Sequence, residues 1–257
     1  MTELVHLGVS GGVATITLDS PANRNALSRQ LTSELADRFD RAISDSVVRT
    51  IVLTGTGTVF CSGADLKEQR DANQSGGNTG PTALAPILEA MWHSPKPVHG
   101  RINGPARAGG IGLLAACDIS VGIEDSTFAI NEVRIGVIPA IISVVVLRKI
   151  ALTTAMELFL TGATFSGRRA VEIGLMTAAA PAAELDASVA NYLEALRMGA
   201  PNALAGAKRL VREVPGMEMH AGFEAMAQRS AEHFASPEAL EGMTAFAEKR
   251  PASWFAG

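Results

Sequence analysis

The chain has 257 residues, of which 47% are hydrophobic and 19% charged, and its formal net charge is −4. These values predict an ordinary globular protein with a sizeable core, built as one large domain or two small ones. Because the chain carries no basic block, nucleic acid is not an expected partner.

The remaining composition argues against several further classes. The N-terminal residues lack a signal-peptide pattern, and no apolar run reaches membrane-spanning length. Cys61 and Cys117 have neither metal-type spacing nor a disulfide framework, and the five histidines form no metal-binding pattern. Ser62 lies in Cys-Ser-Gly, which is not the serine-hydrolase elbow. We therefore expect a cytoplasmic protein without a metal site and without a membrane partner.

The first part of the chain alternates strand and helix patterns. Apolar, β-branched runs at 4–9 and 13–18, separated by a Ser-Gly-Gly turn, predict a β-hairpin. A buried strand is expected at 50–54, and a second helix is expected to start at Asp65. Between them, Ser28 is the expected N-cap of a helix whose apolar residues recur at helical spacing: Leu31, Leu35, Phe39, Ala42 and Ile43.

The middle of the chain continues this alternation. Residues 71–82, rich in Asn, Gly and Ser, are predicted to form a mobile loop rather than a domain boundary. A helix is expected at 84–92, followed by a strand at 96–102 that leads into a glycine cluster and a helix of small apolar residues. Two more strands are expected at 118–123 and 127–130. This order predicts an α/β fold with repeated ββα-like turns.

From residue 151 onward the pattern is almost entirely helical. Ser166 and Ser236 are expected N-caps, and Pro237 suits a first helical turn. The predicted architecture is an α/β body followed by a helical tail. The expected helices of this region span residues 153–160, 166–172, 182–197, 202–213, 217–235 and 237–248.

The first of three segments suited to chemistry is Phe60-Cys61-Ser62-Gly63-Ala64-Asp65-Leu66-Lys67-Glu68. Ala64 can offer its backbone N–H without a bulky side chain in the way. Asp65 can cap the helix that follows, and Lys67, one turn in, can reach a phosphate or an adenine edge. The alternative is a plain loop before a capped surface helix, because Gly-Ala-Asp is a common turn sequence.

The second segment, residues 102–118, combines a strand, a glycine-rich loop and a helix N-terminus. Such backbone can point N–H groups at an oxygen that carries negative charge, and Gly109 allows the closest approach. Gly110-Ile111-Gly112-Leu113-Leu114-Ala115 also fits the G-x-G-x-x-A pattern of dinucleotide-binding folds. That alternative is disfavoured, because the strand should end directly before the first glycine, whereas residues 103–109 intervene.

The third segment, residues 128–140, carries Glu132 between apolar residues. A carboxyl group in such surroundings can have its pKa raised toward the range of a general acid or base. The alternative is an ion pair with Arg134 or another basic side chain, and on local pattern this is the commoner arrangement.

With these segments in this order, the chain resembles the crotonase superfamily, the enoyl-CoA hydratase/isomerase proteins, over nearly its whole length. Phe60 to Glu68 resembles the family motif F-C-x-G-A-D-x-K-E, residues 103–119 its glycine-rich loop and helix, and residues 128–139 the segment bearing its second acid. Within the family, the pattern is most similar to methylglutaconyl-CoA-type hydratases. Further matches are Pro21-Ala22-Asn23-Arg24-Asn25-Ala26-Leu27-Ser28, residues 160–162, residues 170–175 and the C-terminal stretch 241–250.

The resemblance implies a crotonase-like spiral of ββα units over residues 1–195. A helical C-terminal region, residues 196–257, would serve oligomerisation and CoA contacts. Such proteins usually assemble as trimers or dimers of trimers and bind an acyl-CoA thioester. The CoA is then part of the substrate, so no separate cofactor is expected.

The resemblance also assigns site residues. The N–H groups of Ala64 and Gly109 would form an oxyanion hole for the thioester carbonyl as it becomes an enolate. Phe246 and Lys249 match residues that reach a CoA bound mainly by a neighbouring subunit. The positions expected along the CoA arm are Arg24, Ala64, Asp65, Leu66 and Lys67.

The chain departs from the family pattern at Gly112. Typical hydratases carry two glutamates, of which one matches Glu132, and Gly112 stands where the other would be. The resemblance implies syn addition of water to a 2-enoyl-CoA with Glu132 as general acid/base. Two alternatives remain: a double-bond isomerase in which this single Glu moves a proton between C2 and C4, and an acyl-CoA binder without catalysis.

Methylglutaconyl-CoA-type hydratases act on branched or carboxylated enoyl-CoAs. In a protein of that kind, Arg107 or Arg134 would be placed to meet a distal carboxylate as a charge-assisted pair. The favoured interpretation of both arginines is nevertheless a structural or solvated side chain.

Overall fold

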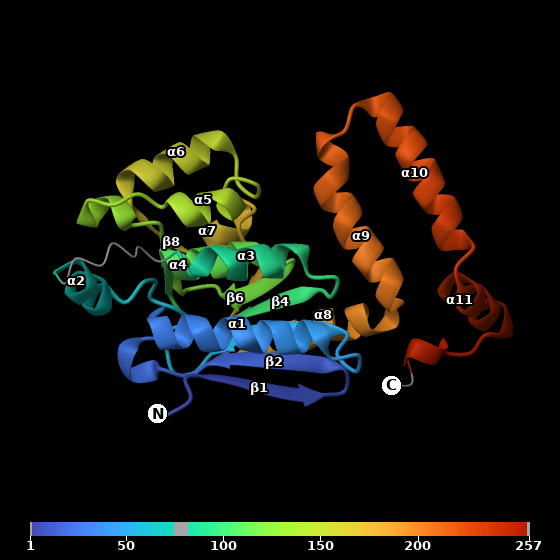
Figure 1. The fold of residues 1–257 in the computed structure, drawn as a ribbon, viewed down its shortest axis with the longest axis horizontal. Coiled ribbons are helices and arrows are strands. Elements are labelled where there is room, and N and C mark those ends of the chain that lie inside the picture. The colour runs from blue at the N-terminus through green and yellow to red at the C-terminus, as the bar shows by residue number, and fades with distance from the viewer. Residues whose placement is uncertain (1, 75–81, 256–257) are drawn as a thin grey trace.

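A computed structural model describes residues 2–74 and 82–255. Its centre is a six-stranded sheet with the strand order β1-β2-β3-β4-β6-β9 (Figure 1). Only the first pair is antiparallel, and every later neighbour is parallel. The strands are β1 (Val5–Ser10), β2 (Val13–Leu18), β3 (Thr50–Gly55), β4 (Val98–Ile102), β6 (Ile119–Ile123) and β9 (Ala178–Ala180).

Helical crossovers join the parallel strands, which confirms the predicted α/β spiral. The crossover from β2 to β3 is α1 (Arg29–Ser44), and its apolar spacing buries Leu31, Leu35 and Phe39. Ser28 caps it as predicted, with the side chain accepting from Leu31 N at 3.2 Å. Between β3 and β4 lie α2 (Leu66–Gln74) and α3 (Leu84–His93), and between β4 and β6 lies α4 (Gly109–Ala116).

A second, three-stranded sheet positions the loops of the site. It has the order β5-β7-β8, with β5 (Ala106–Arg107), β7 (Thr127–Ala129) and β8 (Thr164–Ser166). In the parallel pair β5–β7, Arg107 faces Ala129. The glycine-rich loop after β5 and the segment after β7 therefore leave the sheet at the same edge.

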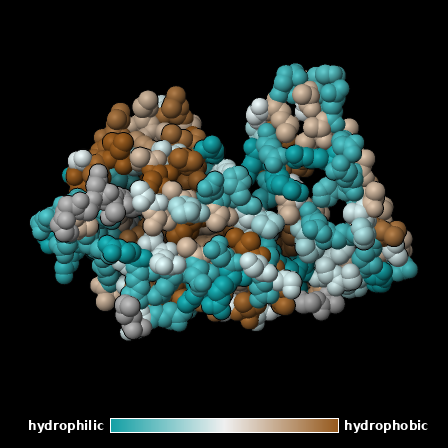
Figure 2. All heavy atoms as spheres, in the orientation of Figure 1, coloured by the Kyte–Doolittle hydropathy of each residue, from teal (hydrophilic) through white to brown (hydrophobic). Residues whose placement is uncertain are grey.

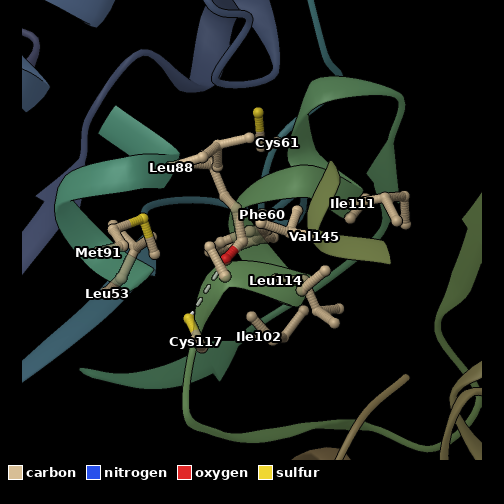
Figure 3. Close-up of a cluster of buried hydrophobic side chains, with 14 of the residues drawn as sticks. Leu53, Phe60, Cys61, Leu88, Met91, Ile102, Ile111, Leu114, Cys117 and Val145 are labelled. Atoms are coloured by element: carbon tan, nitrogen blue, oxygen red, sulfur yellow. Dashed lines mark hydrogen bonds between the residues drawn. The ribbon is translucent and has the colours of Figure 1, made fainter. Parts of the chain in front are cut away.

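The hydrophobic core surrounds α4. Every residue of this helix is buried, which explains its sequence of small and apolar residues. Phe60, Leu88 and Leu114 pack in the cluster shown in Figure 3. The thiol of Cys117 donates to Leu113 O at 3.3 Å, and burial raises its pKa to about 12. Cys117 is thus a packing residue and not a nucleophile.

Four helices complete the body: α5 (Ala140–Val146), α6 (Leu152–Thr161), α7 (Gly167–Glu172) and α8 (Leu185–Met198). The tail comprises α9 (Pro201–Glu213), α10 (Met219–Phe234) and α11 (Pro237–Glu248). Figure 1 shows these three helices standing beside the sheet as an arm. Ser166 and Ser236 are N-caps, as predicted. No helix among residues 2–74 and 82–255 has the length and apolar character needed to cross a membrane.

The arm is attached to the body at both ends. Near its start, Lys208 and Arg212 of α9 pair with Asp118, the former at 2.8 Å. Near its end, Trp254 Nε1 donates to Met198 O at 3.1 Å.

Arg49, directly before β3, also holds the arm. It donates to the carbonyl oxygens of Trp254 and of Gly199, the latter at 2.7 Å. The half-buried side chain of Arg49 therefore holds the two ends of the tail together.

Several sequence expectations need correction. Residues 71–74 belong to α2 rather than to a loop, and residues 75–81 of that predicted loop lie outside the described residues. The region after residue 151 is not purely helical, because β8 and β9 lie within it. The helix expected at 182–197 begins as a 3₁₀ turn. The expected division at residue 195 falls within α8 and stays a prediction.

Candidate active site

The loop after β3 is held by the loop before α1. Leu27 N donates to Gly63 O at 2.8 Å, and Ser62 N donates to Arg24 O at 3.1 Å. The buried amide of Asn25 donates to Thr56 O and Val59 O at 3.0 and 2.8 Å. Two loops far apart in sequence therefore form one rigid unit around Ala64.

Asp65 caps α2, as predicted. Its Oδ1 accepts from the N–H groups of Lys67 and Glu68, both at 3.1 Å, and its Oδ2 accepts from Asn23 Nδ2 at 2.8 Å. Both carboxylate oxygens are thus engaged within the protein. The cap interpretation is correct for this side chain, and a contact of Asp65 with CoA stays a prediction.

The glycine-rich loop lies directly beside this unit. Arg107 N donates to Cys61 O at 3.0 Å. A Cβ built on Gly63 would lie 3.4 Å from Gly109 N, and a Cβ built on Gly109 would meet Leu27 Cδ1 at 2.7 Å. A side chain at position 109 would therefore require Leu27 to shift, which favours glycine where the two loops meet.

Backbone strain marks the entrance of α4. Ala108 has φ +47° and ψ −116°, a conformation that costs a non-glycine residue free energy and clusters at functional sites. Ala108 N donates to Ala129 O at 3.2 Å, which ties the strained residue to β7.

Two amide groups of this region have no partner. Among the residues that the structure describes, neither Ala64 N nor Gly109 N donates to any acceptor. Unsatisfied N–H groups at a helix N-terminus and on an adjacent rigid loop are the donors that an oxyanion hole requires. The structure thus brings together the two backbone donors expected from the sequence.

Glu132 lies at the same edge, three residues beyond β7, in a short 3₁₀ helix Glu132–Ile135. Its side chain is half-buried, Oε2 has no hydrogen-bond partner among the described residues, and burial raises the pKa of the carboxyl group. Arg134 turns instead to Thr161 O, with donor distances of 3.4 and 3.3 Å. The ion-pair alternative for Glu132 and Arg134 is therefore wrong.

Neighbouring side chains fill the space at position 112, where the second glutamate of typical hydratases would lie. Gly112 lies one turn after Gly109 on α4, so a side chain there would project from the same face of the helix. A Cβ at Gly112 would lie 2.6 Å from Ile142 Cγ2 and 3.3 Å from Leu88 Cδ1. Ile142 of α5 fills the space that a second carboxylate would need.

The residues expected along the CoA arm divide into two groups. Arg24, Leu66 and Lys67 are exposed beside Ala64 and can meet a ligand from solvent. Phe246 is 87% exposed on α11, and Lys249 follows at its end, on the side of the molecule opposite α2 (Figure 1). The structure of one chain does not bring these two residues to the site, and their role at a neighbouring subunit stays a prediction.

The remaining candidates have structural roles. Arg107 donates to Ala106 O at 3.0 Å and to Thr127 Oγ1 at 2.8 Å, so both it and Arg134 are structural, as favoured. A Cβ at Gly110 would lie 2.5 Å from Cys61 O. Close packing of α4 therefore explains the glycine spacing without a dinucleotide.

Two residues of the site, Ala108 and Ile142, could not be predicted from the sequence. The positive φ of Ala108 leaves no sequence signal, because alanine rarely adopts that conformation. Ile142 lies within an apolar run and differs from its neighbours only in what it contacts.

Comparison with known proteins identifies the family to which the chain belongs. Residues 8–256 match the model of the enoyl-CoA hydratase/isomerase family. The chain is 33% identical over 245 residues to the enoyl-CoA hydratase EchA19 of Mycobacterium tuberculosis, covering 93% of this chain and 92% of that protein. It is 30% identical over 260 residues to the carnitinyl-CoA dehydratase of Shigella flexneri, covering 99% of each.

Comparison with solved structures supports the same family. Pseudomonas aeruginosa AtuE superimposes with a TM-score of 0.91 at 33% identity, covering 98% of this chain and all of that one. An enoyl-CoA hydratase from Bacillus anthracis gives a TM-score of 0.91 at 28% identity, covering 99% and 100%. The chain belongs to the enoyl-CoA hydratase/isomerase family and has the crotonase fold.

Proposed function

We propose that this protein is an enoyl-CoA hydratase, which adds water across the 2,3 double bond of an acyl-CoA thioester. One observation carries the proposal: among the described residues, the backbone N–H groups of Ala64 and Gly109 have no acceptor, and they share a sheet edge with the half-buried carboxyl group of Glu132, whose Oε2 has no hydrogen-bond partner. Relatives named enoyl-CoA hydratase and carnitinyl-CoA dehydratase support reactions of this type. The reaction as proposed uses no metal and no cofactor besides the CoA of the substrate.

In the proposed mechanism, ionised Glu132 accepts a proton from water while the water oxygen forms a bond to C3 of the substrate. The C2=C3 electron pair shifts toward the thioester, and the N–H groups of Ala64 and Gly109 hold the enolate oxygen. Glu132 then returns the proton to C2, which gives a 3-hydroxyacyl-CoA and the original carboxylate. Because one carboxylate serves both steps from one side, addition is syn.

The test is a panel of 2-enoyl-CoAs incubated with purified protein. Loss of enoyl absorbance, with the 3-hydroxyacyl-CoA identified by mass, supports hydration. Tight binding of the CoA esters without turnover would leave a non-catalytic binder, and binding of NAD(P) would favour an oxidoreductase instead.

A second candidate function is double-bond isomerisation, which we infer from the closed space at Gly112. With Ile142 filling that space, position 112 cannot hold a second carboxylate beside Glu132, and moving a proton between C2 and C4 needs no second acid. Appearance of 2-enoyl absorbance from a 3-enoyl-CoA is the result expected for this activity.

We further propose a homo-oligomer, a trimer or a dimer of trimers, in the cytoplasm. Large apolar side chains are exposed on two separate surfaces, one on α10 and α11 and one over α5 and α6, where Figure 2 shows hydrophobic side chains gathered. Exposed apolar area of this extent is typical of protein interfaces. In such an assembly Phe246 and Lys249 would reach the CoA bound by a neighbour, while Arg24, Asp65, Leu66 and Lys67 would contact it within the same chain.

A further inference from the structure

Helix α2, which follows Ala64, is attached to the body without a buried face. None of its nine residues, all of which the structure describes, is buried. Figure 1 shows α2 at the outer edge of the body, at the end where α1 begins. Because a buried apolar face supplies most of the stability of a helix in a protein, α2 depends on other contacts for its position.

The side chain of Glu68 reaches from the first turn of α2 to the start of α1. Its Oε2 accepts a hydrogen bond from Arg29 N at 2.8 Å. Arg29 is the first residue of α1, so its N–H has no acceptor within that helix. A carboxylate at this end of α1 also interacts favourably with the helix dipole. Glu68 is therefore a cap of α1 that is supplied by α2.

The backbone hydrogen bond is the main contact of Glu68 with α1. Oε1 of Glu68 lies 3.7 Å from Arg29 Nε, but the Arg29 side chain is 78% exposed. An ion pair with so exposed a partner contributes little. The role of Glu68 thus depends on its carboxylate as an acceptor for a backbone N–H group.

Asp65 provides a second tether at the same end of α2. Its Oδ1 caps α2, while its Oδ2 accepts from Asn23 Nδ2 at 2.8 Å. Asn23 lies in the loop before α1, and Arg29 lies at the start of that helix. Two neighbouring carboxylates therefore fix the first turn of α2 to one segment of the chain, residues 23–29.

The oxyanion donor at Ala64 is held by different bonds. Leu27 N donates to Gly63 O at 2.8 Å, and Leu27 and Ala64 form an isolated parallel bridge. Ser62 N donates to Arg24 O on the other side of this loop. Loss of the Glu68 contact should therefore loosen α2 and leave the Ala64 donor in place.

The turn that Glu68 holds also carries two exposed side chains. Leu66 is 57% exposed, and Lys67 beside it is exposed as well. Both side chains are available to a ligand. Because they lie on the first turn of α2, their position relative to Ala64 is set by where that turn is held.

We propose that Glu68 is a positioning residue for substrate binding: by capping α1, it holds the first turn of α2 so that Leu66 and Lys67 meet the CoA of the substrate. This inference rests on the proposed function, which supplies the CoA contacts of these two residues, and adds the residue that fixes them. The acyl-CoA then meets a preformed surface and does not have to order α2 on binding.

Binding of an unreactive ester tests this role apart from catalysis. Glu68→Ala removes the acceptor for Arg29 N, whereas Glu68→Gln keeps an acceptor without the charge. If α2 then stays in place for about a tenth of the time, the apparent Kd of dodecanoyl-CoA rises about tenfold in Glu68→Ala. The rise should be clearly smaller in Glu68→Gln. Equal dissociation constants for wild type and Glu68→Ala, measured by calorimetry on the full chain, would overturn the inference.

Trypsin reports the position of α2 directly, because Lys67 and Arg70 are exposed residues of this helix. Cleavage after these residues, identified by mass, should be about tenfold faster in Glu68→Ala, since proteolysis follows the population of the detached state. Dodecanoyl-CoA should slow this cleavage in wild type and variant alike. An unchanged cleavage rate in Glu68→Ala would contradict the proposed tether.

Two further variants bracket the effect. Asn23→Ala removes the other tether and should change binding and cleavage in the same direction as Glu68→Ala. Glu172→Ala is the matched control, because the exposed Glu172 pairs with Arg169 of its own helix, α7, at 3.2 Å. It should change neither Kd nor cleavage in α2.

Thermal unfolding shows whether the effect is local. The melting temperature of Glu68→Ala should fall by no more than about 2–4 °C, the effect of losing one helix cap in a protein of this size. A larger fall would indicate general destabilisation and would overturn the positioning role.

Turnover separates this inference from the proposed function. With a 2-enoyl-CoA, Glu68→Ala should raise KM about tenfold while kcat stays within about twofold, since saturating substrate holds α2 in place. If the wild type hydrates the ester and Glu68→Ala has the same KM, the hydratase stands and the role of Glu68 fails. If trypsin detects the loosened helix but no CoA ester binds to the wild type, the tether stands and the proposed function fails.

Discussion

At the scale of single residues, Glu132 is held in a state that serves proton transfer at the expense of stability. Its pKa is raised by burial, and no partner satisfies Oε2 within the described part of the chain. Such a group accepts a proton readily and releases it again, as a general acid/base must. The same desolvation makes the ionised form costly to the folded protein.

Replacing Glu132 with Gln should lower kcat by about 10²–10⁴-fold, the usual contribution of a general acid/base, while the melting temperature stays the same or rises. Steady-state kinetics on a 2-enoyl-CoA together with thermal unfolding measure both effects. Glu157→Gln, an exposed carboxylate on α6, is the control. Unchanged kcat in the Glu132 variant would refute the assigned role.

The pH profile follows from the same residue. Hydration starts from the ionised carboxylate, and burial raises the pKa of Glu132 above the ordinary glutamate value of 4.5. Therefore kcat/KM should fall as the pH decreases through an apparent pKa above 4.5. An acid limb at or below that value would contradict the burial of the reacting group.

His99 on β4 makes a second residue-scale prediction. It is fully buried beside Tyr192, with ring centroids 5.8 Å apart, and burial lowers its pKa from 6.5 to about 4. The unfolded chain therefore binds a proton between pH 6.5 and 4 that the folded protein does not. The free energy of unfolding should decrease as the pH falls through this window, by about 3 kcal/mol in total.

His99→Leu should flatten that dependence, because leucine has no proton to gain. Denaturant unfolding of both proteins at a series of pH values between 4 and 7 gives the comparison. His220→Leu serves as the control, because His220 is exposed on α10 and its loss should leave the slope intact. If the free energy of unfolding depends on pH equally in the wild type and in His99→Leu, another group is responsible for the titration.

At the scale of elements, the packing of α5 against α4 decides how many carboxylates the site can hold. Gly112→Ala places its Cβ 2.6 Å from Ile142 Cγ2, so we expect a loss of about 1–3 kcal/mol in the free energy of unfolding. Adding Ile142→Ala should recover part of that loss, a non-additivity that a double-mutant cycle measures. If the losses of the two single variants simply add in the double variant, Gly112 of α4 and Ile142 of α5 are not in contact.

Elements with a local signal could be predicted from the sequence. The hairpin follows from alternation, and α1 and α11 follow from apolar spacing after a serine cap. The strands β5, β8 and β9 could not be predicted, since each has two or three residues and exists only through pairing with a distant strand. Alanine at all three positions of β9 gives no strand signal.

The candidate site shows the same division. The sequence was enough to assign roles to Ala64, Gly109 and Glu132, because these roles follow from residue type and from the order of the motifs. Ile142 could not, because its role depends on where α5 lies against Gly112. That Glu132 does not pair with Arg134 was also not predictable, since only the structure shows that Arg134 turns toward Thr161.

At the scale of the whole molecule, two apolar surfaces on different parts of one chain predict assembly. Leu152 and Leu160 on α6 are 70% and 72% exposed, and Phe223 on α10 is 72% exposed. Surfaces that differ from each other pair head-to-tail, and such contacts form a ring when the rotation between neighbouring subunits closes. Sedimentation should therefore give a particle that is a multiple of 26.8 kDa.

Phe223→Glu should shift that particle toward the monomer, since it places a charge within the apolar surface of α10. His220→Glu, an exposed polar position on the same helix, should leave the assembly intact. A monomeric wild-type protein at micromolar concentration would refute the predicted oligomer.

The double attachment of the arm has a consequence for proteolysis. The exposed turn Val214–Gly216 between α9 and α10 is a natural cleavage site, because it projects between two helices. A cut there would leave the first fragment tied through Asp118 and the second tied through Arg49 and Trp254. The nicked protein should therefore run as two bands in denaturing gels yet elute as one species under native conditions. In an Arg49→Ala variant, the smaller fragment should dissociate more readily after the same cut, because the hydrogen bond from Arg49 to Trp254 O is lost.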